Sequence, residues 1–153
     1  MTTSRSTLMA AVAACFAAGA AWAGSPGQTS NHSKLWQHGK YLVTQAAPCS
    51  DCHTPRNRQG ELVASRALQG APIDLKPMHP VPGWAVAAPG IAGLPAGWSF
   101  DQTAHFLETG LTPSGGHAGP PMPAFRFNAR DARAVATYLQ SLPSAKAAAT
   151  TRH

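Results

Sequence analysis

The residues best suited to chemistry form a C-x-x-C-H run, Cys49-Ser50-Asp51-Cys52-His53. Two thiols three positions apart can each add to one vinyl group of a haem. The histidine that follows is then carried beneath the iron as its proximal ligand. The pattern therefore predicts that Cys49 and Cys52 attach one c-type haem covalently and that His53 binds its iron.

Three other kinds of site use cysteine pairs. A zinc half-site needs two more ligands at metal spacing, and the sequence has no second cysteine pair. A thioredoxin-type redox pair belongs near a βαβ pattern with apolar strands, which this sequence lacks. A disulfide across only two intervening residues would constrain very little chain. Haem attachment is the interpretation that the sequence favours.

Residues 1–23 have the features of a secretory signal peptide. Arg5 supplies a positive charge, an apolar stretch runs from Leu8 to Ala21, and Ala21-Trp22-Ala23 fits the small-x-small cleavage rule. The stretch is too short and too rich in alanine to indicate a membrane span, so we expect no transmembrane segment after cleavage. An exported, periplasmic protein agrees with haem attachment, which takes place outside the cytoplasm.

The N-terminus also permits a second interpretation. Val12-Ala13-Ala14-Cys15 resembles a bacterial lipobox, which would make the protein lipid-anchored through Cys15. Against this, Phe16-Ala17-Ala18 continues the apolar run where a lipoprotein normally turns polar.

The chain is basic and poor in large apolar residues. It contains 12 Lys+Arg and 6 Asp+Glu, and removal of residues 1–23 leaves a net charge of +5. Between residues 24 and 153, Leu, Ile, Val and Phe make up only 21 of 130 residues. That is little material for a core, so we expect a bound apolar group to fill part of the interior. Nucleic-acid binding is not expected, because aromatic stacking positions and Lys/Arg stripes are absent.

Two segments resemble the class I c-type cytochromes. Gly39-Lys40-Tyr41-Leu42-Val43 leads into the C-x-x-C-H run, and Thr54-Pro55 follows it. Near the other end, Gly119-Pro120-Pro121-Met122-Pro123-Ala124-Phe125 precedes a predicted helix that ends Tyr138-Leu139-Gln140-Ser141-Leu142-Pro143. The resemblance implies an all-α cytochrome c fold, with three to four helices wrapped round one covalently attached haem and long Pro/Gly-rich loops.

The expected domain organisation follows from this resemblance and from composition. Residues 24–32 are expected to form a flexible lead-in, 33–143 the cytochrome c domain, and 144–153 a disordered tail. Ser33 can cap the first helix. Residues 54–98 contain several prolines and are expected to be mostly extended loop, with no convincing strand.

Two later helices have clear start and stop signals. Ser99-Phe100-Asp101-Gln102 is a capping-box pattern, and Gly110 is a plausible C-terminal stop. Residues 111–123 follow as a loop. Asn128 begins the last helix, whose apolar stripe consists of Val135, Tyr138, Leu139 and Leu142 and which Pro143 ends.

Gly39 lies inside the first predicted helix, where glycine costs about 1 kcal/mol relative to alanine. In class I cytochromes a glycine of the first helix lets the last helix cross closely beside an aromatic residue. The resemblance assigns that aromatic position to Tyr138. A glycine that is merely tolerated near the middle of a helix is the other interpretation.

The resemblance implies that Met122 is the distal iron ligand. A thioether is neutral and soft, so it raises the reduction potential relative to a second histidine. Prolines on both sides of Met122 would stiffen the loop that holds it. The other candidate ligands in the mature chain are Met78, His79, His105 and His117.

The function that the resemblance implies is electron transfer. A haem bound by His53 and Met122 has no free coordination position, and it can cycle between Fe(III) and Fe(II) without acting as an enzyme. The expected partners are redox proteins with acidic docking surfaces, and the chain could be a subunit of a dehydrogenase complex. The alternative is a five-coordinate haem protein, bound through His53 alone, that binds a small gas or reacts with peroxide.

Overall fold

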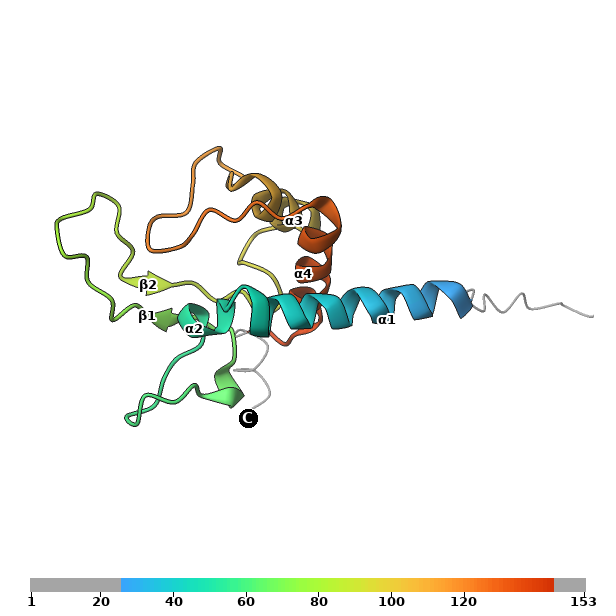
Figure 1. The fold of residues 1–153 in the computed structure, drawn as a ribbon, viewed down its shortest axis with the longest axis horizontal. Coiled ribbons are helices and arrows are strands. Elements are labelled where there is room, and N and C mark those ends of the chain that lie inside the picture. The colour runs from blue at the N-terminus through green and yellow to red at the C-terminus, as the bar shows by residue number, and fades with distance from the viewer. Residues whose placement is uncertain (1–25, 145–153) are drawn as a thin grey trace, which may run out of the picture.

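The computed structural model describes residues 26–144 of the chain, and helices dominate its regular structure. The elements, in chain order, are α1 (Pro26–Tyr41), the π turn η1 (Leu42–Ala46), α2 (Cys49–His53), the 3-10 turn η2 (Ala64–Arg66), β1 (Ala71–Pro72), β2 (Ala87–Ala88), α3 (Phe100–Thr109) and α4 (Ala129–Ser141). Figure 1 shows their arrangement. The predicted all-α fold is confirmed. The predicted signal peptide, the lipobox at Cys15 and residues 145–153 lie outside the described residues.

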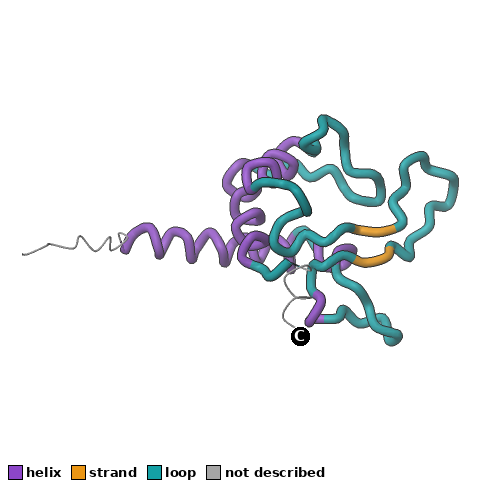
Figure 2. The backbone as a smooth tube through the Cα atoms, turned by 180° about the vertical axis from the view of Figure 1, so that it is seen from behind, coloured by secondary structure: helices purple, strands orange, loops and turns teal. Residues whose placement is uncertain are grey.

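The sheet is a two-residue antiparallel pair, in which Ala71 faces Ala88 and Pro72 faces Ala87. The expectation of no strand between residues 54 and 98 is wrong to this extent. Such short strands carry no alternating pattern, so nothing in the sequence indicated them. Figure 2 shows the two strands as the base of a long loop. Within residues 26–144, no helix is long and apolar enough to cross a membrane.

The first helix begins earlier than its sequence suggested. It starts at Pro26, so Ser33 lies inside the helix and the predicted cap at Ser33 is wrong. Residues 26–32 of the expected lead-in are accordingly helical. Proline is favoured in the first turn because its missing N–H would have no helical partner there. At its other end the helix widens into η1, where the Ala47 N–H donates to the Leu42 carbonyl at 2.8 Å.

The crossing of α1 and α4 organises the fold (Figure 1). A β-carbon built on Gly39 would overlap the carbonyl oxygen of Ala134 and would lie 3.0 Å from Cβ of Tyr138. The rings of Trp36 and Tyr138 meet edge to face at 5.4 Å. The predicted close approach at Gly39, with Tyr138 beside it, is therefore confirmed.

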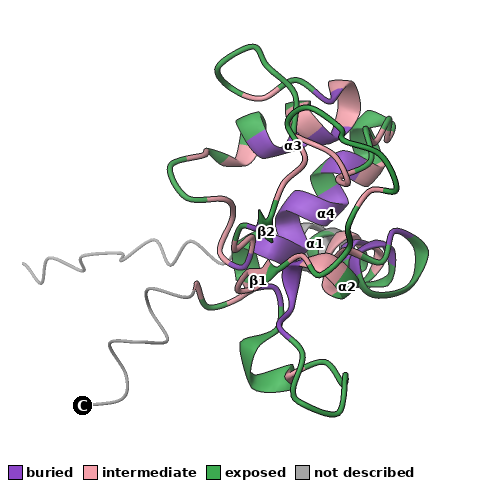
Figure 3. Ribbon diagram, turned by 90° about the vertical axis from the view of Figure 1, so that its left-hand side faces the viewer, coloured by how far each residue is buried: buried purple, intermediate pink, exposed green. Residues whose placement is uncertain are grey.

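The core around this crossing is built largely from small side chains. Its largest fully buried residues are Val43, Leu68 and Val135. Most of the others are alanines, namely Ala92, Ala104, Ala132, Ala134 and Ala136. Figure 3 shows the buried residues concentrated along α4. This core agrees with the low content of large apolar residues in the sequence.

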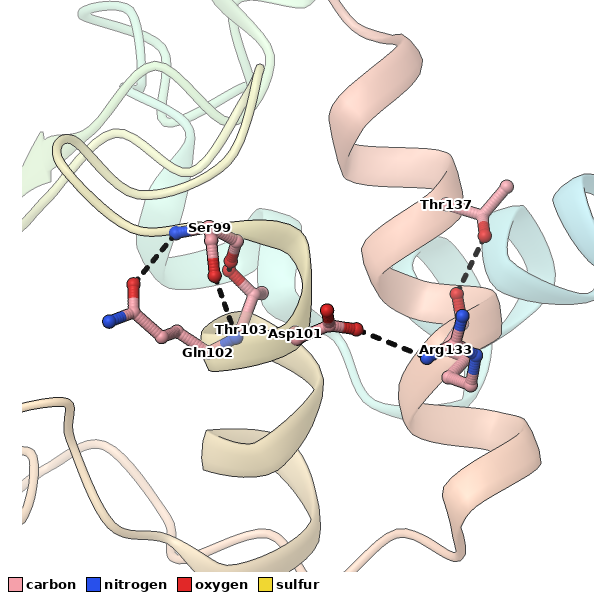
Figure 4. Close-up of polar contacts among 6 residues, drawn as sticks. All are labelled: Ser99, Asp101, Gln102, Thr103, Arg133 and Thr137. Carbon is pink, nitrogen blue, oxygen red and sulfur yellow. Dashed lines mark hydrogen bonds and ion pairs between the residues drawn. The ribbon is translucent and has the colours of Figure 1, made fainter.

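Helix α3 has the predicted signals at both ends. The Gln102 N–H donates to Ser99 Oγ at 3.1 Å, and the Ser99 N–H donates to Gln102 Oε1 at 2.8 Å. Gly110 ends the helix in the left-handed region, with φ of 76°. Arg133 on α4 reaches Asp101 on α3 at 3.2 Å (Figure 4). The capping box and the glycine stop are both confirmed.

Replacing Ser99 with alanine should lower the free energy of unfolding by about 1 kcal/mol, because it removes the cap that satisfies the Gln102 N–H. Urea unfolding followed by circular dichroism measures the change. Ser65→Ala, at an exposed position in η2, is the control. Equal stability of the two variants would contradict the capping role.

Helix α4 also begins as predicted. The Asp131 N–H donates to Asn128 Oδ1 at 2.9 Å, and the Asp131 carboxylate accepts from His38 on α1 at 2.7 Å. Val135, Tyr138 and Leu139 are buried. One acidic residue thus joins the start of α4 to α1.

Candidate functional site

The C-x-x-C-H run folds as its own short helix, α2. Cys49 and Cys52 are both free thiols and both partly buried. Residues three apart on a helix lie on the same face. The two thiols can therefore reach two substituents of one planar group.

His53 is buried, with 5% of its surface exposed. Its Nδ1 lies 2.7 Å from the carbonyl oxygen of Pro89, which can only accept, so Nδ1 carries the proton. Nε2 then keeps the lone pair that a metal would bind. Burial lowers the pKa of His53, against the smaller opposing effect of the Pro89 hydrogen bond. The net result is a neutral, oriented imidazole suited to ligation.

Pro89 is a residue of the candidate site that sequence reasoning missed. It lies 36 residues after His53, and it acts through its carbonyl group. Neither a spacing rule nor a side-chain type marks a backbone carbonyl as a partner. His53 has a further backbone partner, since the Gly70 N–H donates to the His53 carbonyl at 2.8 Å.

Cys49 is kept as a neutral thiol by its surroundings. Its Sγ lies 2.9 Å from the carbonyl oxygen of Ala47, which follows the π turn η1. Burial raises the pKa of Cys49 to about 11. A zinc ligand or a redox nucleophile would need the thiolate, which this environment disfavours. Among residues 26–144 there is also no group of three or more His, Cys, Asp or Glu that could hold a metal ion.

Met122 is carried by a different segment, the loop between α3 and α4. It is partly buried and lines a small pocket. The other residues of that pocket are Phe106, Gly110, His117, Ala118, Pro123 and Ala124. The thioether thus lies among mostly apolar neighbours, of which His117, Ala118, Pro123 and Ala124 are exposed.

The alternative ligands differ in their surroundings. Met78 is 95% exposed. His79 and His105 are exposed as well. His117 is exposed too, but it shares the pocket of Met122, and its Nδ1 donates to the Gly110 carbonyl at 3.0 Å. His117 is therefore the histidine best placed to replace Met122 at a metal.

The residues present fit a c-type haem. Two free thiols lie on one helix, and a neutral imidazole with an available Nε2 follows them. Several partly buried apolar side chains pack against the small core, including Ile91, Leu94, Phe100, Phe106, Phe125 and Phe127. When bound, such a haem supplies a one-electron Fe(III)/Fe(II) couple.

Three curated proteins are similar in sequence to this chain. The cytochrome subunit of fructose dehydrogenase from Gluconobacter japonicus is 34% identical over 122 residues, covering 74% of this chain and 23% of that protein. A diheme c-type cytochrome from Cereibacter sphaeroides is 34% identical over 113 residues, covering 71% and 36%. These similarities support a c-type cytochrome.

A nicotinate dehydrogenase subunit from Pseudomonas putida is also similar, at 37% identity over 119 residues. That match covers 72% of this chain and 9% of the relative. The chain spans about a third or less of the length of each of these three proteins. No protein-family model matches the chain.

Proposed function

We propose that this chain is a class I c-type cytochrome that transfers electrons through one covalently bound haem. Cys49 and Cys52 attach the haem, His53 is the proximal ligand and Met122 the distal ligand. The observation that carries the proposal is the buried imidazole of His53, whose Nδ1 is engaged by Pro89 and whose Nε2 is left for iron. The sequence contains one C-x-x-C-H run, which corresponds to a single haem.

The ligand residues have separate tasks. Cys49 and Cys52 would hold the haem on α2 through two thioether bonds. The Pro89 hydrogen bond keeps the imidazole of His53 in one tautomer and one orientation. The Met122 thioether would bind the iron as a soft, neutral ligand that favours the reduced form. With His53 and Met122 both bound, the haem would supply one-electron chemistry without a free position for a gas or peroxide.

The partners follow from the relatives and from charge. Two of the relatives are named as a cytochrome subunit and a diheme cytochrome, which supports an electron carrier rather than an enzyme. We infer that this chain receives electrons from a periplasmic dehydrogenase, as a shuttle or a subunit, and passes them to a downstream acceptor. Its basic residues include exposed Arg56, Arg58 and Arg66, close after α2. Acidic partner surfaces would bind there through salt-sensitive contacts.

The Met122→Ala variant tests the distal ligand. Wild-type protein, exported in a host that matures c-type haem, should show the near-infrared absorption of methionine-bound ferric haem. Met122→Ala should lose that absorption, and its reduced form should bind carbon monoxide rapidly because the distal position is open. Ferric and ferrous spectra and stopped-flow carbon monoxide binding measure both effects.

Met78→Ala is the matched control, because Met78 also has prolines close by but is 95% exposed. It should keep the wild-type spectrum. In the Met122→Ala variant the distal position at the iron could be open, or His117 could bind there instead. A double variant, Met122→Ala with His117→Ala, distinguishes these two cases. Rapid carbon monoxide binding by the wild type would instead favour the five-coordinate alternative.

A further inference from the structure

The loop between the two strands reaches across to the loop that carries Met122. We call residues 73–86 the arm and residues 111–123 the methionine loop. The Ala85 N–H at the end of the arm donates to the Pro120 carbonyl at 2.7 Å. A β-carbon built on Gly119 would overlap the carbonyl oxygen of Gly83. Figures 1 and 2 show, from opposite sides, that both segments project from the same end of the molecule.

The arm is tied to itself near these contacts. The Ile73 N–H donates to the Val86 carbonyl at 2.9 Å, which extends the pairing of β1 with β2. The Trp84 indole N–H donates to the Leu75 carbonyl at 3.0 Å. Hydrogen bonds therefore hold the end of the arm, which contacts the methionine loop, against the beginning of the arm.

The same stretch of chain also holds His53. Residues 83–89 contact the methionine loop through Gly83 and Ala85 and continue through β2 to Pro89. The carbonyl of Pro89 accepts the Nδ1 proton of His53. One short segment thus touches the elements that carry both proposed axial ligands.

We propose that residues 83–89 form a strap that positions the methionine loop relative to His53 and so maintains the ligation of iron by Met122. This inference rests on the proposed function, because it takes Met122 as the distal ligand. The positioning residues of this strap are Gly83, Ala85 and Gly119. Gly119 is required at the contact because any side chain would push the two backbones apart.

A shift at Gly119 is transmitted to Met122. The Met122 N–H donates to the Gly119 carbonyl at 3.3 Å, so one turn joins the contact point to the ligand. The residues between them are Pro120 and Pro121, whose rings restrict backbone rotation. A stiff turn cannot absorb the displacement, and the weak bond between thioether and iron is the one expected to yield.

Gly119→Ala tests the strap, with Gly116→Ala as the matched control in the same loop. Neither glycine has a positive φ, and a β-carbon at Gly116 would lie in ordinary contact with the Thr112 hydroxyl, at 3.6 Å. Gly119→Ala should weaken or abolish the methionine absorption of the ferric protein. It should also accelerate carbon monoxide binding to the ferrous protein at least about tenfold, while covalent haem and helix content stay unchanged. Gly116→Ala should match the wild type in every readout.

Ala85→Pro removes the hydrogen-bond donor to Pro120 without adding bulk at Gly119 and should act in the same direction. If the Gly119→Ala protein does not accumulate, Ala85→Pro alone tests the strap. Wild-type absorption and carbon monoxide kinetics in both variants would overturn the strap while leaving Met122 as the ligand. Absence of the methionine absorption from the wild type itself would overturn the ligand assignment and the strap with it.

Discussion

Replacing Cys49 and Cys52 together with alanine should abolish covalent haem attachment. Each thiol is expected to form one thioether bond, so the double variant has no atom left to make one. Each single variant should keep a haem on the remaining bond, with a shifted pyridine haemochrome spectrum because one vinyl group stays unreacted. Haem staining after denaturing electrophoresis and haemochrome spectra measure the two outcomes.

Cys15→Ala is the matched control, because Cys15 is the one cysteine of the printed sequence that lies outside the C-x-x-C-H run. It should leave covalent haem unchanged. Release of the protein from membranes in this variant alone would support the lipid anchor. Covalent haem in the double variant, or none in a wild type whose host matures a control cytochrome, would contradict haem attachment at α2.

Replacing Gly39 with valine should destabilise the protein by about 3 kcal/mol or more, a large share of the stability of an ordinary domain. The new side chain would overlap the Ala134 carbonyl, which belongs to the backbone of α4 and cannot rotate away. The helices must then separate, which breaks the packing of Trp36 on Tyr138. Denaturant unfolding of the haem-loaded protein measures the loss.

Gln37→Val is the control for this change. It places the same β-branched residue at an exposed position of α1, so it carries the cost in helix propensity without the clash. Gly39→Ala should fall between the two, because its single methyl group already meets the carbonyl. Equal stability of Gly39→Val and Gln37→Val would show that the two helices can separate at little cost.

Local signals in the sequence predicted local structure well. Helix α3 has its predicted ends at Ser99, Gln102 and Gly110, and α4 begins at the predicted Asn128. These ends could be predicted because helix caps depend on side chains within one turn of the helix end. The predicted cap at Ser33 was wrong because such a signal is only local. A serine followed by an apolar stripe does not exclude an earlier start, and Pro26 supplies one.

The residue types and their spacing predicted which residues form the candidate site, and the resemblance to class I cytochromes implied the contact between the first and last helices. Cys49, Cys52 and His53 are neighbours in the chain, so they stay close together in any fold, and the structure places them on one short helix. Gly39 was noticeable because a glycine inside a helix needs a reason. The resemblance then supplied its partner, Tyr138, which no local spacing indicates.

The orientation of the imidazole and the contacts of the methionine loop could be learned only from the folded chain. The partner of His53 is the carbonyl of Pro89, and the contacts of the methionine loop are the backbone groups of Gly83 and Ala85. Every residue has a carbonyl group and all but proline have an N–H, so sequence cannot mark which of them will pair across 35 or 36 positions. Such pairs form when the packed helices and the β1–β2 arm bring distant backbone together.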